Sequence, residues 1–199
     1  MNNHTNLKNE LENEIEEYEE DKTIQKSAVY EWTESLVISL AVLMMVMLFC
    51  CRLIGVDGSS MYPTLQDHDR IVISNMFYTT PKKGDIVVLT KKSFLPQPIV
   101  KRVIATEGDT IDIDFEAGEV IVNGEVLQED YINEPVSDYN TGNMEFPQTV
   151  PEGCVFVMGD NRNHSSDSRV QDLGMVDVRY IQGRVLGRVL PLSAFGKVE

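Results

Sequence analysis

Cysteine, histidine and basic residues are scarce in this chain of 199 residues. Three cysteines do not make a disulfide framework, and the sequence has no C-x-x-C pair or other spacing typical of a zinc site. We therefore expect neither a metal nor a cofactor. The 17 Lys and Arg residues are outnumbered by 32 Asp and Glu, which makes the formal net charge −15. So acidic a chain repels phosphate backbones, which argues against a nucleic-acid partner.

Acidic residues are concentrated at the start of the chain. Residues 1–34 contain ten Asp or Glu and three Lys, and the stretch from Glu10 to Asp21 holds few apolar residues. This composition is typical of a solvated tail that is partly helical or disordered. An acidic docking arm is the alternative, but no motif supports it.

One long apolar run follows this tail. The sixteen residues from Leu36 to Cys51 include no charge, and extension to Gly55 gives twenty residues with one charge, Arg52. At about 1.5 Å per residue, a helix of this length reaches about 30 Å, the thickness of the hydrocarbon core of a bilayer. A cleaved signal peptide would need a short basic segment before the run, and a buried core helix would need a polar face. The sequence therefore predicts an acidic tail over 1–34, an uncleaved transmembrane helix over 35–55 and a further domain over 56–199.

After the apolar run, short segments rich in β-branched residues alternate with turns. Their length and spacing favour a mainly β domain, a barrel or a sandwich, over βαβ units. Asn123-Gly124 between two such segments suits the type I′ turn of a hairpin. The polar stretch 133–153 is longer than a plain turn, and we interpret it as a surface excursion. The expected strands are 70–74, 85–90, 99–106, 110–114, 119–122, 125–127, 154–158 and 184–190.

A loop with two serines comes directly after the run. Ser59 and Ser60 stand between a glycine and a proline, a composition that suits a tight loop, and an ordinary polar turn is the simplest interpretation. A serine acts as a nucleophile only with a base beside it. His68 lies in an acidic turn and is expected to be exposed, and His164, in a polar loop, is expected to have a loop or capping role.

Lys101 is another candidate base, because burial disfavours the charged form of a lysine and so lowers its pKa. It lies in the expected strand 99–106, where alternation puts Lys101 on one face and Arg102 on the other. One of these two cations must therefore share a face with apolar neighbours. An edge strand with both charges turned outward is an equally open alternative.

A third polar segment, Gly159–Arg169, follows the expected strand 154–158. It is rich in short side chains that hydrogen-bond to backbone and in carboxylate and guanidinium partners. A calcium loop starting at Asp160 is excluded, because Arg162 would occupy its third position, where an oxygen ligand is needed.

These segments, in this order behind one apolar run, resemble the type I signal peptidases, which are membrane-bound bacterial serine proteases with a Ser–Lys dyad. The resemblance extends over about residues 36–190. The matching segments are Gly58-x-Ser60-Met61-x-Pro63-Thr64-Leu65, Gly84-Asp85-Ile86-Val87-Val88, Lys101-Arg102-Val103-Ile104 with Gly108-Asp109, and Gly159-Asp160-Asn161-Arg162 with Ser165-x-Asp167-Ser168-Arg169.

The resemblance implies that Ser60 is the nucleophile and Lys101 the general base, and that an acyl-enzyme forms and is resolved by water. The backbone N–H of Ser60 would form part of the oxyanion hole. Some members have a second donor, a hydroxyl, at the position of Gly58, so Ser59 is a substitute candidate for that role.

The resemblance also assigns roles to the third polar segment. Ser165 matches a serine that orients the lysine. Asp167 and Arg169 match an ion pair that supports the structure beside the site.

The implied reaction is removal of signal peptides from exported preproteins by cleavage after sites such as Ala-x-Ala. Shallow apolar pockets would accept the small side chains before the cut, although the same residues would serve equally well as strand core. The candidate pocket residues are Ile54, Val56, Met61, Ile99 and Val100.

Basic residues flank the apolar run in equal number, so charge alone does not orient it. The orientation of the family places the acidic tail in the cytoplasm and the β domain outside the cell membrane. The expected partners are exported preproteins and the lipid bilayer, and the oligomeric state is left open.

Two other functions remain open. A self-cleaving protease of the repressor type shares a Ser–Lys dyad, but the apolar run and the lack of a DNA-binding region argue against it. The alternative from another class is a membrane-tethered, non-catalytic β domain that binds peptides. The presence of both Ser60 and Lys101 argues against this second alternative.

Overall fold

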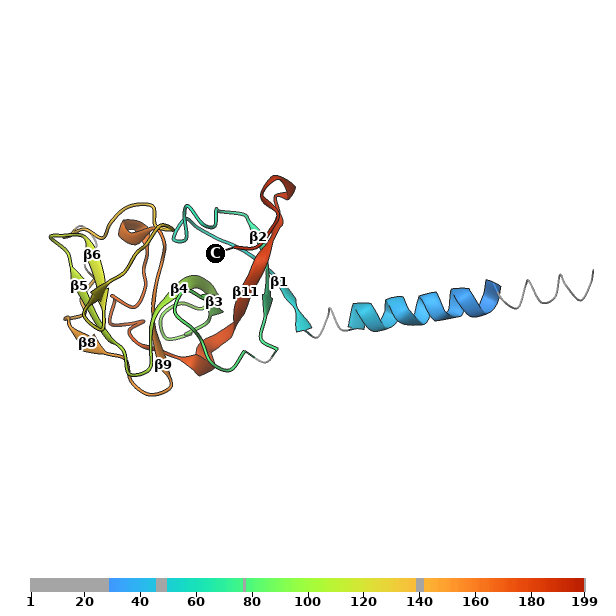
Figure 1. Ribbon diagram of the computed structural model, residues 1–199, viewed down its shortest axis with the longest axis horizontal. Helices are drawn as coiled ribbons and strands as arrows, with labels where there is room; N and C mark the ends of the chain where they lie inside the picture. Colours follow the sequence, from blue (N-terminus) through green and yellow to red (C-terminus); the bar gives the residue numbers. More distant parts are fainter. Residues whose placement is uncertain (1–28, 46–49, 77, 139–141, 199) are drawn as a thin grey trace, which may run out of the picture. The chain divides into compact units, whose positions relative to one another are not determined.

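The computed structural model describes residues 29–45, 50–76, 78–138 and 142–198. The chain divides into two units, Met1–Phe49 and Cys50–Glu199. In the first unit, residues 29–45 form a helix with exposed side chains (Figure 1). Most of the predicted acidic tail and positions 46–49 of the predicted transmembrane segment lie outside the described residues.

Across the described parts of the chain, no helix combines the length and the apolar character needed to cross a membrane.

The last four residues of the predicted transmembrane helix are instead a strand. Strand β1 (Arg52–Gly55) pairs antiparallel with β2 (Arg70–Ser74) and forms an edge of the larger sheet. Only Ile54 of the four residues is partly buried. Hydropathy alone does not separate the end of a helix from a short apolar strand, because the partner strand decides the outcome.

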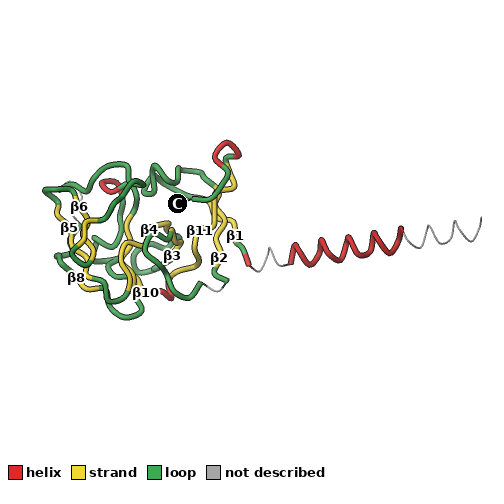
Figure 2. The backbone as a smooth tube through the Cα atoms, viewed as in Figure 1, coloured by secondary structure: helices red, strands yellow, loops and turns green. Residues whose placement is uncertain are grey.

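Two antiparallel sheets make up the second unit (Figures 1 and 2). The larger has the strand order β1-β2-β11-β3-β4-β9-β10 and the smaller the order β7-β6-β5-β8. Every strand pairing within the described residues is antiparallel, which confirms the prediction of a mainly β domain. The remaining strands are β3 (Ile86–Leu89), β4 (Ile99–Thr106), β5 (Thr110–Asp114), β6 (Glu119–Val122), β7 (Glu125–Val126), β8 (Gln148–Thr149), β9 (Cys154–Met158), β10 (Val176–Asp177) and β11 (Ile181–Leu190).

The predicted strands are all present. The bounds of β2, β4, β5, β6 and β9 agree with the prediction, whereas β3, β7 and β11 differ at their ends. Asn123 and Gly124 have φ values of 54° and 82°, and positive φ at both positions is what a type I′ turn requires. Besides β1, the prediction missed β8 and β10, because two residues are too few to show an alternating pattern.

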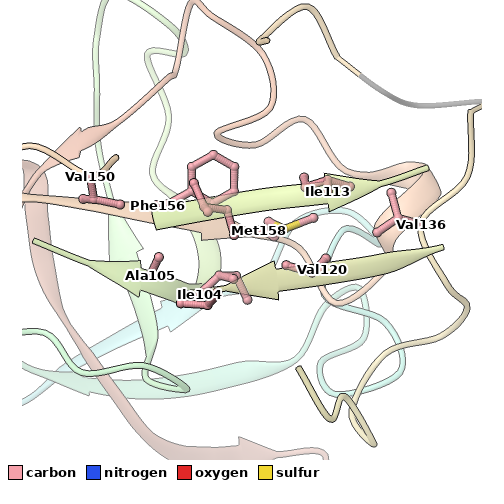
Figure 3. Packing of buried hydrophobic residues seen from close by; sticks show 10 residues of the cluster. Ile104, Ala105, Ile113, Val120, Val136, Val150, Phe156 and Met158 are labelled. Atoms are coloured by element: carbon pink, nitrogen blue, oxygen red, sulfur yellow. The ribbon is translucent and has the colours of Figure 1, made fainter. Parts of the chain in front are cut away.

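Strand β4 lies inside the larger sheet, between β3 and β9, so the edge-strand alternative is wrong. Both of its cations, Lys101 and Arg102, are only 3% exposed. The far end of β4, at Ile104 and Ala105, packs with Phe156 of β9 against the smaller sheet (Figure 3). Lys101 and Arg102, nearer the start of β4, are thus two buried cationic side chains in the interior of the sheet.

Candidate active site

Lys101 and Ser60 are in direct contact, although 41 positions separate them in the chain. Lys101 Nζ donates a hydrogen bond of 2.7 Å to Ser60 Oγ and one of 3.0 Å to the carbonyl oxygen of Val100. Ser60 begins a turn that is anchored by two buried side chains, Met61 and Leu65. The apolar anchors thus place a half-buried hydroxyl beside a buried amine.

Burial changes the acid–base behaviour of Lys101. Desolvation lowers the pKa of its ammonium group from the ordinary value of 10.5 to about 8, with a smaller contribution in the same direction from Arg169. The negative charges of Asp167 and Asp160 oppose this shift. No carboxylate of the described residues forms a salt bridge with Lys101. At neutral pH about a tenth of the molecules therefore hold a neutral amine that can accept a proton.

The loop after β9 packs against the serine segment. Asn161 N–H donates to the carbonyl oxygen of Ser60 at 3.1 Å, and Asn161 Nδ2 donates to that of Ser59 at 3.0 Å. A Cβ atom at Gly159 would collide with Ser60 O and with Ser165 Oγ. Only glycine therefore allows this loop to approach the serine so closely.

Ser165, Asp167 and Arg169, predicted as supporting residues, are all buried at this place. Two nitrogens of Arg169 bind the Asp167 carboxylate at 2.8 and 2.9 Å, and this carboxylate also accepts from Gly159 N–H at 3.1 Å. Burial raises the pKa of Asp167, but the hydrogen bonds and charge of Arg169 outweigh it, so the pKa is lowered. The ion pair holds the loop that carries Gly159 and Ser165.

A second buried ion pair lies next to Lys101. Arg102 binds both oxygens of Asp160, at 2.8 and 2.7 Å, and Asp160 also accepts from Thr64 Oγ1 at 2.5 Å. The ring of Tyr131 lies 3.9 Å from the Arg102 guanidinium carbon. Thr64 belongs to the serine segment, so this pair connects β4, the loop after β9 and the turn that starts at Ser60.

Sequence reasoning missed a third pair, Arg162 with Glu129. Two nitrogens of Arg162 each bind a Glu129 oxygen at 2.6 Å, and both side chains are nearly inaccessible. Glu129 and Tyr131 lie in the segment that follows β7, which has no local pattern that marks it as part of a site. Only their long-range partners reveal their position.

The predicted pocket residues fall into two groups. Val56, Met61 and Val100 share one apolar cluster, and Ile54 packs against it. Ile99 packs instead against a different cluster, which contains Val87, Leu89 and Val103. Ile99 therefore packs in a different apolar cluster from the other four predicted pocket residues, although Val100 is its neighbour in the chain.

The other polar candidates have simpler surroundings. Ser59 and His68 are exposed, and the imidazole of His68 lies 3.3 Å from Asp67. His164 is exposed at the end of a 3-10 helix, Arg162–His164. In the part of the chain that the structure describes, no group of His, Cys, Asp and Glu side chains could hold a metal ion.

The same segments match known proteins. The family model described as signal peptidase, peptidase S26, matches residues 29–190. A probable signal peptidase I-1 of Synechocystis is 36% identical, over 82% of this chain and 83% of that protein. Signal peptidase I of Bacillus amyloliquefaciens is 34% identical, over 91% and 98%. A crystal structure of a signal peptidase I from Enterococcus faecalis V583 is 31% identical and covers 53% of this chain and 96% of that one, with a TM-score of 0.44.

The family model and the relatives from Synechocystis and Bacillus define a class of hydrolase. The chain is a serine peptidase. It belongs to the signal peptidase family, peptidase S26.

Proposed function

We propose that this peptidase removes signal peptides from exported preproteins, with Ser60 as nucleophile and Lys101 as general base. The observation that carries the proposal is the 2.7 Å hydrogen bond between Lys101 Nζ and Ser60 Oγ, made by an amine whose pKa is lowered to about 8. A lysine in this environment can act as a base near neutral pH, as the nucleophilic serine requires.

Neutral Lys101 takes the proton of Ser60 as Oγ attacks the scissile carbonyl carbon. The negative charge that develops on the carbonyl oxygen is stabilised by the Ser60 N–H, with the exposed Ser59 as candidate second donor. The Lys101 ammonium then gives its proton to the leaving amine, and the acyl-enzyme remains. Lys101 next takes a proton from water as the water attacks the acyl carbon, and returns this proton to Ser60 Oγ as the bond between Oγ and the acyl carbon breaks.

Buried Ser165 lies on the same loop as Gly159, close to the serine segment, and we assign it the role of orienting the lysine. The ion pair between Asp167 and Arg169 keeps that loop in place. These two residues act on the reaction through the loop rather than by contact with the substrate.

Cleavage after small residues, as in Ala-x-Ala, suits shallow apolar pockets beside the serine. One apolar cluster contains four of the candidates, Ile54, Val56, Met61 and Val100. Met61 directly follows Ser60 in the chain, which supports a role of this cluster in such pockets. Ile99 remains a proposed pocket residue, although it packs against another cluster.

The apolar run of the sequence supports a membrane anchor, which would end before β1 at Arg52. The acidic tail over 1–34 would then be cytoplasmic and the domain from about 56 onward extracytoplasmic. This arrangement would place Ser60 close to the bilayer surface, where the signal peptide of a preprotein emerges.

The test uses the full chain, solubilised in detergent, and a purified preprotein with an Ala-x-Ala site. We expect wild type to cut after that site and Ser60→Ala and Lys101→Ala to be inactive, whereas Ser166→Ala and Lys92→Ala, at exposed positions, act as wild type does. Cutting by Ser60→Ala would refute the dyad. If folded wild type binds the preprotein but does not cut it, the non-catalytic peptide-binding domain becomes the better assignment.

A further inference from the structure

Asn161 makes two hydrogen bonds to the backbone on the two sides of the Ser59–Ser60 peptide. Its own N–H donates to Ser60 O at 3.1 Å, and its side-chain Nδ2 donates to Ser59 O at 3.0 Å. The residue is 6% exposed, so solvent has little access to these bonds. One residue therefore holds consecutive carbonyl groups of the serine segment.

Tyr62 N–H also donates to the Ser59 carbonyl oxygen, at 3.0 Å, so Asn161 and the turn together fix the direction of the Ser60 amide. The Ser59–Ser60 peptide is trans and planar, so the Ser59 carbonyl oxygen and the Ser60 amide hydrogen point in opposite directions. When Nδ2 of Asn161 holds the Ser59 oxygen, the Ser60 N–H must point away from the loop after β9. No described residue accepts a hydrogen bond from that N–H, so it remains available to a substrate.

The loop that carries Asn161 is itself held on both sides. Asp160 is fixed by Arg102 and Thr64, and the Arg162 guanidinium by Glu129. Each of these contacts involves a buried charge, and such contacts resist displacement because an unpaired buried charge is costly. Asn161 is thus attached to a rigid frame rather than to a loose turn.

The acceptor side of this side-chain amide goes unused. Oδ1 of Asn161 is buried and has no hydrogen-bond partner among the described residues. A buried acceptor without a partner destabilises the folded state, so an apolar side chain of the same size would suit this position as well or better. The stability of the folded state therefore does not by itself explain why position 161 is an asparagine.

We propose that Asn161 is a positioning residue that aims the Ser60 N–H at the carbonyl oxygen of the substrate. The inference rests on the proposed role of Ser60 as nucleophile. Both the formation and the hydrolysis of the acyl-enzyme place negative charge on the same oxygen, so a misdirected N–H slows both steps. Substrate binding and proton transfer to Lys101 do not depend on it.

The test compares Asn161→Leu, which keeps the branched shape with larger end groups and removes the donor, with Asn161→Ala and the matched control Asn163→Ala. Asn163 lies in the same loop and bonds to Ser137 and Pro135 rather than to the serine segment. We expect kcat for preprotein to fall about 10- to 100-fold in both Asn161 variants, less than for loss of a whole oxyanion donor. KM should stay within about twofold, and the pH midpoint of the reaction should not move.

A peptide aldehyde gives a second measurement, because its adduct with Ser60 carries the oxygen that the N–H would bind. Its affinity should fall by the same factor as kcat in the Asn161 variants and stay unchanged in Asn163→Ala. Asn161→Leu should be as resistant to thermal unfolding as wild type, so a lost fold would not be the cause.

Three results would overturn the inference: an unchanged kcat in folded Asn161→Leu, a rise in KM at constant kcat, or a shift of the pH midpoint. If Ser60→Ala is inactive in the same assay, the proposed function stands and only the role of Asn161 is lost. If Ser60→Ala cuts the preprotein as well as wild type does, the proposed function fails and this inference fails with it.

Discussion

Lys101 and Arg102 are neighbours on β4 and are equally buried, yet their hydrogen-bond partners differ in charge. Two of the three guanidinium nitrogens of Arg102 bind Asp160, and the ring of Tyr131 covers the group. Lys101 has only a hydroxyl and a carbonyl oxygen as hydrogen-bond partners among the described residues. Burial with a carboxylate partner keeps a cation charged, whereas burial with neutral partners favours its neutral form.

The comparison separates a reactive region from a supporting one. The lysine side holds the proposed base, whose pKa is lowered to about 8, and its charged form destabilises the fold. The arginine side, with Asp160, Arg162 and Glu129, is a set of paired charges that holds the surrounding loops. Substitutions on the lysine side should act on activity, and those on the arginine side on stability.

Exchange of the two cation types gives the largest expected effect. Lys101→Arg should lower kcat/KM by about 10³-fold or more, because a guanidinium does not lose its proton and cannot serve as base. Arg102→Lys should remain active, with its free energy of unfolding lowered by about 1–3 kcal/mol through loss of the two-point bond. Preprotein cleavage and urea unfolding measure the two effects. Equal activity losses in both variants would contradict the division into regions.

Removal of a carboxylate from the arginine side comes next. Glu129→Gln leaves the Arg162 guanidinium buried without a counter-charge and should lower the free energy of unfolding by about 2–4 kcal/mol. The matched variant Glu119→Gln, at an exposed position of β6, should stay near wild type. Denaturant titration checks both. The pH profile of activity should be the same in the two variants, and a shifted profile would show that Glu129 also acts on Lys101.

The pH dependence of activity follows from the lowered pKa of Lys101. The base is the neutral amine, so kcat/KM should rise about tenfold per pH unit below pH 8 and level off above it. Cleavage rates between pH 6 and pH 10, with stability monitored at each pH, measure this profile. A rate that does not change from pH 6 to pH 9, with chemistry rate-limiting, would exclude Lys101 as the base.

The same lysine should destabilise the fold below pH 8. There the amine must lose its proton or stay charged in a buried site, whereas in the unfolded chain it titrates near 10.5. Between pH 8 and pH 10.5 the unfolded chain binds more protons, so this penalty shrinks as pH rises. Lys101→Met should therefore be more stable than wild type at pH 7 by about 1–3 kcal/mol, and the difference should vanish near pH 10.5. A constant difference across this range would show that packing, not charge, is its cause.

The smallest effect is expected at an ion pair on the surface. Arg179 binds Asp177 at 2.5 Å, but the arginine side chain is 86% exposed, and water replaces the lost interaction. Arg179→Gln should leave the thermal midpoint and the activity unchanged. A clear loss of stability here would show that the contrast between buried and exposed pairs has been overstated.

The local pattern of the sequence predicted much of the fold. Short runs rich in β-branched residues and bounded by turns marked β2, β4, β5, β6 and β9, and Asn123-Gly124 marked the hairpin turn, because these features depend on near neighbours. Ser60 and Lys101 were identified through the resemblance of their segments to a family, not through any property of an isolated serine or lysine.

Tertiary structure alone decided the rest. The sequence did not distinguish an edge strand from a central one, so the burial of Lys101, on which its low pKa depends, was undetermined until β3 and β9 were seen on its two sides. The pair of Arg162 with Glu129 and the bonds from Asn161 to Ser59 and Ser60 join positions 33 to 102 apart in the chain. Short-range propensity determines which segments are strands, but the pairing of the strands determines which charges are buried and which atoms meet.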